Sequence, residues 1–194
     1  MNKIVLIDGN NILFRSYYAT AYSGSLMKNS KGEPTNALYG LINMLNKIIS
    51  EEKPTHIMIA FDKGKTFRHD KYLTYKAGRS EMPDELKKQF LVAYDLVTSM
   101  GIKYLMVDNY EADDIIGTFA RMVDESDNFE GLIVSSDKDL LQLISEKVKV
   151  KLLKNHDEYI MMDKEKFKEI YGLSDPKRII DLKSLMGDSS DNIP

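Results

Sequence analysis

The sequence contains no cysteine, and only three of its 194 residues are histidine. Disulfide bonds and thiolate metal sites are therefore excluded, and a histidine-rich zinc site is not expected. No stretch approaches the roughly 20 apolar residues of a membrane span, and residues 1–8 (MNKIVLID) turn acidic too early for a signal peptide. These absences fit a reducing, cytoplasmic setting without a membrane partner. They leave carboxylates as the ligands of any metal site, which suits Mg²⁺ or Mn²⁺.

The order of apolar patterns predicts the fold class. Short apolar runs predict strands at residues 3–7, 56–61, 102–107 and 131–134, and weaker alternation predicts a hairpin at 148–153 and 159–162 around a turn at 155–158. Helical spacing predicts helices that begin near residues 10, 36, 84 and 111, and others over 140–144, 164–171 and 176–186, while 23–34 reads as a loop. Because strands alternate with helices, we expect an α/β fold with a mostly parallel central sheet and helices on both faces.

Acidic residues follow four of the expected strands. Glu111, Asp113 and Asp114 lie within one turn, where two charges about 5 Å apart repel by about 3 kcal/mol at an effective dielectric of about 20. Each acidic residue alone could be a turn or a helix cap, but at the carboxyl edge of one sheet they jointly favour a metal cluster. The candidate ligands are Asp8, Asp62, Glu111, Asp113, Asp114, Asp137 and Asp139, and Asp188 and Asp191 could complete the set.

Carboxylates suit Mg²⁺, which keeps several waters and takes few protein ligands directly. Two such ions about 4 Å apart are a known solution for phosphodiester hydrolysis. We therefore expect two Mg²⁺ or Mn²⁺ ions as cofactors, although spacing does not assign which carboxylates bind directly.

A basic stretch at residues 63–80 stands out in a chain of net charge −3. It holds six Lys or Arg and one Asp, a local balance of +5, and such a patch indicates phosphate binding. A solvated loop is the alternative interpretation. If the segment is helical, one face carries two aromatic rings for base stacking and two cations for phosphates: Tyr72, Tyr75, Lys76 and Arg79. Arg15, one short helix after Asp8, could point at the same site.

Seven ordered motifs resemble those of bacterial 5′ nucleases, which are the N-terminal 5′–3′ exonuclease domain of bacterial DNA polymerase I and its stand-alone relatives in the flap endonuclease superfamily. The resemblance covers essentially the whole chain. The motifs are Ile7-Asp-Gly-Asn10, Ala60-Phe-Asp62, Thr66-Phe-Arg-His69, Tyr75-Lys-Ala-Gly-Arg79, Asn109-Tyr-Glu-Ala-Asp-Asp-Ile-Ile-Gly117, Ser136-Asp-Lys-Asp-Leu140 and Met186-Gly-Asp-Ser-Ser-Asp-Asn-Ile-Pro194.

The resemblance implies roles for individual residues. Lys76 and Arg79 would contact the scissile phosphate with help from Arg15, Tyr75 would stack on the terminal base, and Tyr72 and Arg68 would also contact DNA. Residues 63–82 would form a helical arch over the site. One metal group would comprise Asp8, Asp62, Glu111 and Asp113, and the other Asp137, Asp139, Asp188 and Asp191, with Asp114 nearby.

The resemblance also implies an activity and a domain organisation. The reaction would be hydrolysis of DNA near the junction of a 5′ flap, or of a 5′ single-stranded end, with duplex, serving primer removal in replication and repair. Residues 1–194 would form one resolvase-like (PIN-like) 5′ nuclease domain, acting as a monomer and joined in some relatives to a polymerase domain. Family members continue past the match to Pro194 into a duplex-binding helix-three-turn-helix, which we expect to be absent from this sequence.

Three other interpretations fit parts of the pattern. A Toprim-type domain also combines Glu with Asp-x-Asp at strand ends, but its first strand carries Glu where this chain has Asp8. A PIN-type ribonuclease shares the acidic edge but is shorter and lacks the arch. A metal-binding and DNA-binding fragment without catalysis would retain the same residues.

Overall fold

The computed structural model describes residues 1–21, 26–154 and 158–193. Its strands are β1 (Asn2–Asp8), β2 (His56–Ala60), β3 (Lys103–Leu105), β4 (Phe129–Ser135), β5 (Val148–Leu153) and β6 (Tyr159–Met162). Its helices are α1 (Gly9–Ala21), α2 (Asn36–Glu52), α3 (Phe67–Lys71), α4 (Asp84–Ser99), α5 (Ala112–Glu125), the 3-10 helix η1 (Lys138–Leu143), α6 (Lys164–Tyr171) and α7 (Arg178–Met186).

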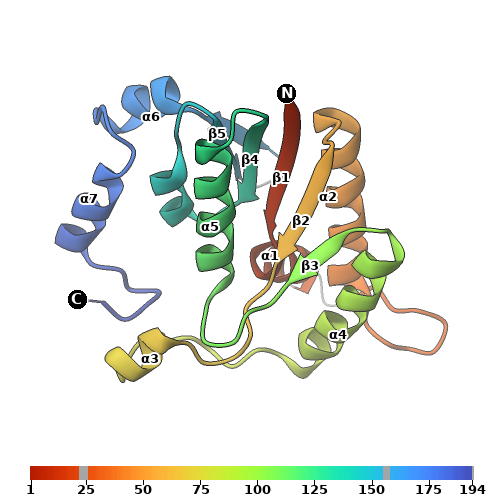
Figure 1. The fold of residues 1–194 in the computed structure, drawn as a ribbon. Coiled ribbons are helices and arrows are strands. Elements are labelled where there is room, and N and C mark those ends of the chain that lie inside the picture. Colours follow the sequence, from red (N-terminus) through yellow and green to blue (C-terminus); the bar gives the residue numbers. More distant parts are fainter. Residues whose placement is uncertain (22–25, 155–157, 194) are drawn as a thin grey trace.

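The strands form one sheet in the order β3-β2-β1-β4-β5-β6 (Figure 1). All neighbouring pairs are parallel except β5 and β6, which pair antiparallel as a hairpin. The chain winds outward from β1 through β2 to β3, then returns to the other side of β1 to add β4. This reversal places a topological switch point between β1 and β4, where ligands of open α/β sheets bind at the carboxyl ends of the strands.

Side-chain alternation along the strands divides the core between the two faces of the sheet. Val5 and Ile7 of β1 pack in one cluster with apolar residues of α1, α2 and α4. Leu6, between them, packs in the other cluster with residues of α5, η1, α6 and α7. Because successive strand residues point to opposite faces, both faces of the sheet are covered by helices. The expected α/β fold is therefore confirmed.

The boundaries of several elements agree with the sequence patterns and others do not. The strands at 148–153 and 159–162 and the helix at 164–171 have the predicted limits. The third strand is only Lys103–Leu105, not 102–107, because it pairs with β2 over three residues at the edge of the sheet. The last helix begins at Arg178 rather than at 176. Residues 23–25 of the predicted loop and 155–157 of the predicted hairpin turn lie outside the described residues.

The segment that holds Tyr72, Tyr75, Lys76 and Arg79 is not helical, so these side chains do not share a helical face. Helix α3 ends at Lys71, residues 73–79 form consecutive turns, and Lys76 has a left-handed backbone with φ of 57°. The stretch has no apolar stripe to bury, and short helices gain most of their stability from such packing. In the described part of the chain, no helix is long and apolar enough to cross a membrane.

Candidate active site

Asp8 is the last residue of β1 and lies at the switch point of the sheet. Its Oδ1 accepts a hydrogen bond from the backbone N–H of Asn11 (3.0 Å), and its Oδ2 accepts one from the Ser135 hydroxyl at the end of β4 (3.0 Å). Only 6% of its surface is exposed. Burial outweighs these hydrogen bonds and raises the pKa of Asp8 to about 6. The fold thus holds this carboxyl where its charge is unfavourable.

Asp62 follows β2 and ties that strand to its neighbours. Its Oδ1 accepts from the backbone N–H of Ala112, the first residue of α5 (2.7 Å). Its own N–H donates to the Asn10 side chain (2.9 Å). An anion at the start of a helix also interacts favourably with the helix dipole. This contact with the first turn of α5 positions the Asp62 carboxylate near Asp8, and both side chains line one cavity.

Asp113 is the least compensated of the nine carboxylates. Within the described ranges it makes no hydrogen bond or ion pair, although the neighbouring Asp114 makes both. Burial, followed by the charges of Asp8, Asp137 and Asp62, raises the pKa of Asp113 to about 8. These carboxyls, with Glu111, line a cavity of about 240 Å³ that Lys76 and Arg79 border. A cation in that cavity would relieve the repulsion among them.

Of the other carboxylates, Asp137 accepts a hydrogen bond from the backbone N–H of Asp139 (2.8 Å), and the rest are paired with cations from three segments of the chain. Arg68 donates two hydrogen bonds to Asp114 (2.7 and 2.8 Å), which hold the pKa of Asp114 below its usual value although burial alone would raise it. Glu111 accepts from Lys76 (2.7 Å) and from the Tyr75 hydroxyl (3.1 Å). These contacts bring the basic stretch onto the N-terminal end of α5.

Lys183 of α7 pairs with two of these carboxylates, Asp139 and Asp188, the latter at 2.7 Å. This contact, and hydrogen bonds from Ser190, lower the pKa of Asp188. Burial still raises the pKa of Asp139 above its usual value despite the same lysine. Lys183 is not identifiable as a site residue from the sequence, because a lysine inside a helix five residues before an aspartate carries no distinguishing signal.

The turns at residues 72–79 are joined to the loop that follows α7. Arg79 pairs with the Asp191 carboxylate (2.6 Å), and the Lys76 N–H donates to the Asp191 carbonyl (3.1 Å). The Tyr72 hydroxyl donates to the Asn192 carbonyl (3.2 Å), while the Asn192 side chain donates to Thr74 (3.1 Å). Lys76 and Arg79 therefore reach the acidic edge without being in a helix.

A second cavity, of about 620 Å³, adjoins the first and shares five lining residues with it: Lys76, Arg79, Glu111, Asp113 and Asp137. It adds Asp114, Asp139, Asp188 and Asp191, so the two cavities together are lined by all nine predicted carboxylates. Over the described residues, no three acidic or histidine side chains are arranged to hold one ion as they stand. The oxygen donors fit a hard divalent cation in chemistry and charge, although they do not form a ready coordination shell.

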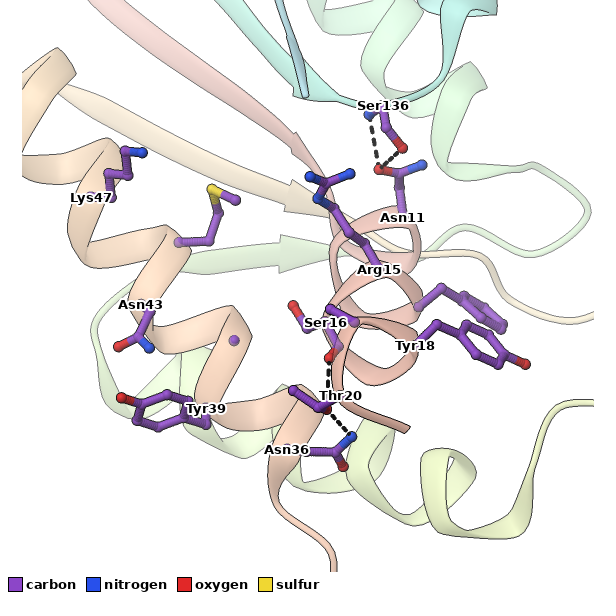
Figure 2. Close-up of a pocket in the computed structure, with 14 residues that line it drawn as sticks. Asn11, Arg15, Ser16, Tyr18, Thr20, Asn36, Tyr39, Asn43, Lys47 and Ser136 are labelled. Atoms are coloured by element: carbon purple, nitrogen blue, oxygen red, sulfur yellow. Dashed lines mark hydrogen bonds between the residues drawn. The ribbon is translucent and has the colours of Figure 1, made fainter. Parts of the chain in front are cut away.

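Arg15 lies apart from these two cavities, contrary to the expectation that it points at the acidic edge. It lines a groove of about 880 Å³ between α1 and α2, with Tyr39 and Lys47 on the α2 side (Figure 2). This groove meets the acidic edge at Asn11, whose side chain accepts hydrogen bonds from the N–H and hydroxyl of Ser136 (2.9 and 2.8 Å). Ser136 directly precedes Asp137, so the groove ends one residue from the candidate site.

Comparisons with known proteins agree with the motifs. Residues 3–172 match the model of the 5′–3′ exonuclease N-terminal, resolvase-like domain. The chain is 47% identical over 194 residues to DNA polymerase I of Bacillus caldotenax, an alignment that covers 99% of this chain but 21% of that protein. It is 43% identical over 195 residues to the 5′–3′ exonuclease of Bacillus subtilis (strain 168), covering 100% of this chain and 65% of the relative. The chain thus spans only part of the length of either relative.

The fold is shared with a nuclease of known structure. The bacteriophage T5 flap endonuclease, in a complex with DNA and metal ions, superposes with a TM-score of 0.73 at 22% identity, over 98% of this chain and 68% of that one. Together with the family match, this confirms the resemblance inferred from the motifs. The chain belongs to the 5′–3′ exonuclease family, of which it carries the N-terminal, resolvase-like domain.

Proposed function

We propose that the chain is a metal-dependent 5′ nuclease domain that hydrolyses phosphodiester bonds of DNA at a 5′ flap or 5′ single-stranded end beside a duplex. The observation that carries the proposal is the pair of adjoining cavities in which uncompensated carboxylates face Lys76 and Arg79. Anionic oxygens for cations and basic side chains for phosphate thus border the same space. The family match and the name of the T5 relative support the substrate class.

The inner carboxylates Asp8, Asp62 and Asp113, with Glu111, are the residues that would hold one divalent cation, and Asp137, Asp139, Asp188 and Asp191 those that would hold a second, with Asp114 nearby. Mg²⁺ or Mn²⁺ suits this all-oxygen donor set. When bound, divalent cations supply positive charge against the phosphate oxygens and promote ionisation of the attacking water. The raised pKa of Asp8 and of Asp113 supports this assignment, because a cation would replace the missing countercharge.

The basic side chains would bind and orient the substrate. Lys76 and Arg79 pair with Glu111 and Asp191 at 2.7 and 2.6 Å. When cations neutralise these carboxylates, both side chains become available to the scissile phosphate. Tyr75, whose ring lies under the Lys76 ammonium at 4.9 Å, would stack on the terminal base, with Tyr72 and Arg68 in further contact with the strand. Arg15 would contact DNA from the groove between α1 and α2.

Residues 1–194 would act as one nuclease domain, with residues 63–82 covering the site. The DNA polymerase I relatives are about five times longer than the matched region. We therefore also propose that this domain is joined to a polymerase domain in its parent protein and that it serves in primer removal and repair. The products would carry a 5′-phosphate and a 3′-hydroxyl.

Cleavage of a labelled 5′-flap DNA in Mg²⁺, Mn²⁺ or EDTA tests the proposal. We expect metal-dependent cleavage, reduced at least about a hundredfold in Asp113→Asn, because ligand and ligand-support groups at metal sites have effects of that size. Asp127→Asn is the matched control, since Asp127 is fully exposed beside the amino end of β4, at the opposite edge of the sheet. Cleavage that persists in EDTA, or that is equal in the two variants, would contradict the proposal.

A further inference from the structure

The cavity of about 620 Å³ continues beyond the carboxylates along helix α5. One face of the helix lines it, at spacings of three and four residues: Asp114, Gly117, Thr118 and Arg121. Gly117 has no side chain to close the space, and the nearest atom to a Cβ at that position would be a Leu143 methyl at 3.6 Å. The cavity therefore extends from the acidic edge to the guanidinium of Arg121.

The chemistry of the lining changes along this extension. Past Asp114 the cavity is bordered on α5 by Thr118 and Arg121 and on η1 by Gln142 and Leu143. Among these described residues there is no carboxylate, whereas the part near Asp113 is crowded with them. The positive charge of Arg121 and the neutral polar side chains beside it are complementary to the negatively charged phosphates of a nucleic-acid backbone, which recur at regular spacing.

Arg121 has donors to spare for such a phosphate. Its Nε donates to Glu125 one turn later (2.7 Å), and its side chain is 80% exposed. An exposed helical ion pair of this kind contributes little to stability. The terminal nitrogens of the guanidinium make no hydrogen bond or ion pair with the described residues, and this fork suits phosphate oxygens.

We propose that Arg121 is a substrate-binding residue that contacts a phosphate of the DNA strand near the scissile bond. Arg121 follows Asp114 by seven positions in the helix, which corresponds to roughly 10 Å along the axis. Backbone phosphates of one strand of a duplex advance by about 3.4 Å per step, so for a strand that runs parallel to α5 the contacted phosphate lies about three nucleotides from the cleavage site. This assignment rests on the proposed function, because it assumes that the scissile phosphate binds at the carboxylates.

The test measures binding of fluorescent 5′-flap DNA by anisotropy in Mg²⁺, with the Asp113→Asn background used to prevent cleavage. Arg121→Gln should weaken binding about two- to fivefold at low salt and reduce the salt slope by about 0.9, the value for one lost phosphate contact. Glu125→Gln should not weaken binding, because it frees the guanidinium. If Arg121 acts only through its ion pair with Glu125, the two substitutions would have the same effect, which would overturn the proposal.

A second exposed ion pair supplies the matched control. Arg178 and Asp181 of α7 pair at 2.9 Å, are exposed at 66% and 62%, and lie outside both cavities. Arg178→Gln makes the same change in net charge, and we expect it to leave the salt slope unchanged. If Arg178→Gln and Arg121→Gln weaken DNA binding equally, the proposal is also overturned. The effect of Arg121 would then come only from the net charge of the protein.

Neutral linkages in the DNA locate the contact. A methylphosphonate placed singly at each position within five nucleotides of the cleavage site should abolish the effect of Arg121→Gln at one position, about three nucleotides away, because two changes to one contact are not additive. Additive effects at every position would contradict the assignment. If the wild-type chain neither binds nor cleaves flap DNA, the proposed function itself fails, which is a different result from normal binding that is insensitive to Arg121.

Discussion

The carboxylates at the edge of the sheet fall into two groups that differ in their countercharges. The inner group, defined as Asp8, Asp62, Asp113 and Asp137, forms no ion pair within the described ranges. The outer group, defined as Glu111, Asp114, Asp139, Asp188 and Asp191, is paired with Arg68, Lys76, Arg79 and Lys183. The fold therefore neutralises the rim of the site with its own cations and leaves the centre without them.

The ion-paired rim of the site therefore contributes to stability, whereas its unpaired centre is suited to binding a ligand. An ion pair at the rim stabilises the folded chain modestly, whereas uncompensated carboxylates at the centre cost free energy when they ionise. Such a cost is commonly offset by a ligand that binds only the folded state. A divalent cation is the ligand whose charge and preference for oxygen match the inner group.

The largest expected effect is a divergence with pH between wild type and Asp113→Asn in EDTA. The folded-state pKa of Asp113 is raised from 3.8 to about 8, so the folded state keeps a proton that the unfolded state loses. Stability from this group is therefore fully present below about pH 4 and is lost as the pH rises toward 8. Asparagine does not titrate. The free energy of unfolding of the variant should therefore rise relative to that of wild type by up to about 1.4 kcal/mol per pH unit in that window.

Chemical denaturation at several pH values between 4 and 8 measures this divergence. Asp127→Asn should stay parallel to wild type, because its carboxylate is fully exposed. If the difference in unfolding free energy between Asp113→Asn and wild type stays constant or shrinks as the pH rises, the carboxyl of Asp113 does not lack a countercharge.

Metal addition should give the next largest effect. Mg²⁺ at a hundredfold excess over its Kd should raise the free energy of unfolding of wild type by about 2.7 kcal/mol, because it binds only the folded state. EDTA should reverse the gain. Asp113→Asn should lose most of it, while Asp127→Asn should keep it. Thermal melting across a Mg²⁺ titration provides the measurement, and an undiminished gain in Asp113→Asn would remove the inner group from the metal site.

The sequence predicts the carboxylates of both groups but not the ion pairs of the outer one, for a physical reason. Asp8 and Asp62 follow buried strands, and parallel strands bring their carboxyl ends to one edge, so local patterns suffice. The countercharges come from far along the chain: Lys183 reaches Asp139 from α7, and Arg79 reaches Asp191 across 112 positions. Such pairings depend on how loops pack, which residue spacing does not encode.

The segment at 72–79 shows the same limit. Its spacing of aromatic and basic residues predicted a helical face, but the chain forms turns with a left-handed residue at Lys76. The side chains nevertheless reach the acidic edge, because Tyr75 and Lys76 both contact Glu111. The residue types were thus informative about the site even where the predicted local structure was wrong.

Two adjacent aspartates test the central claim most directly. Asp113 has no partner among the described residues, whereas Asp114 has two hydrogen bonds from Arg68 and one from the Glu111 N–H. In EDTA at pH 7.5, Asp113→Asn should stabilise the chain by on the order of 1–3 kcal/mol, since Asp113 must take up a proton on folding below its raised pKa and asparagine need not. Asp114→Asn should destabilise it by about 1 kcal/mol, since it breaks a partly exposed bidentate pair. Opposite signs in one denaturation experiment are the predicted result, and a shared sign would contradict the division of the site into a compensated rim and an uncompensated centre.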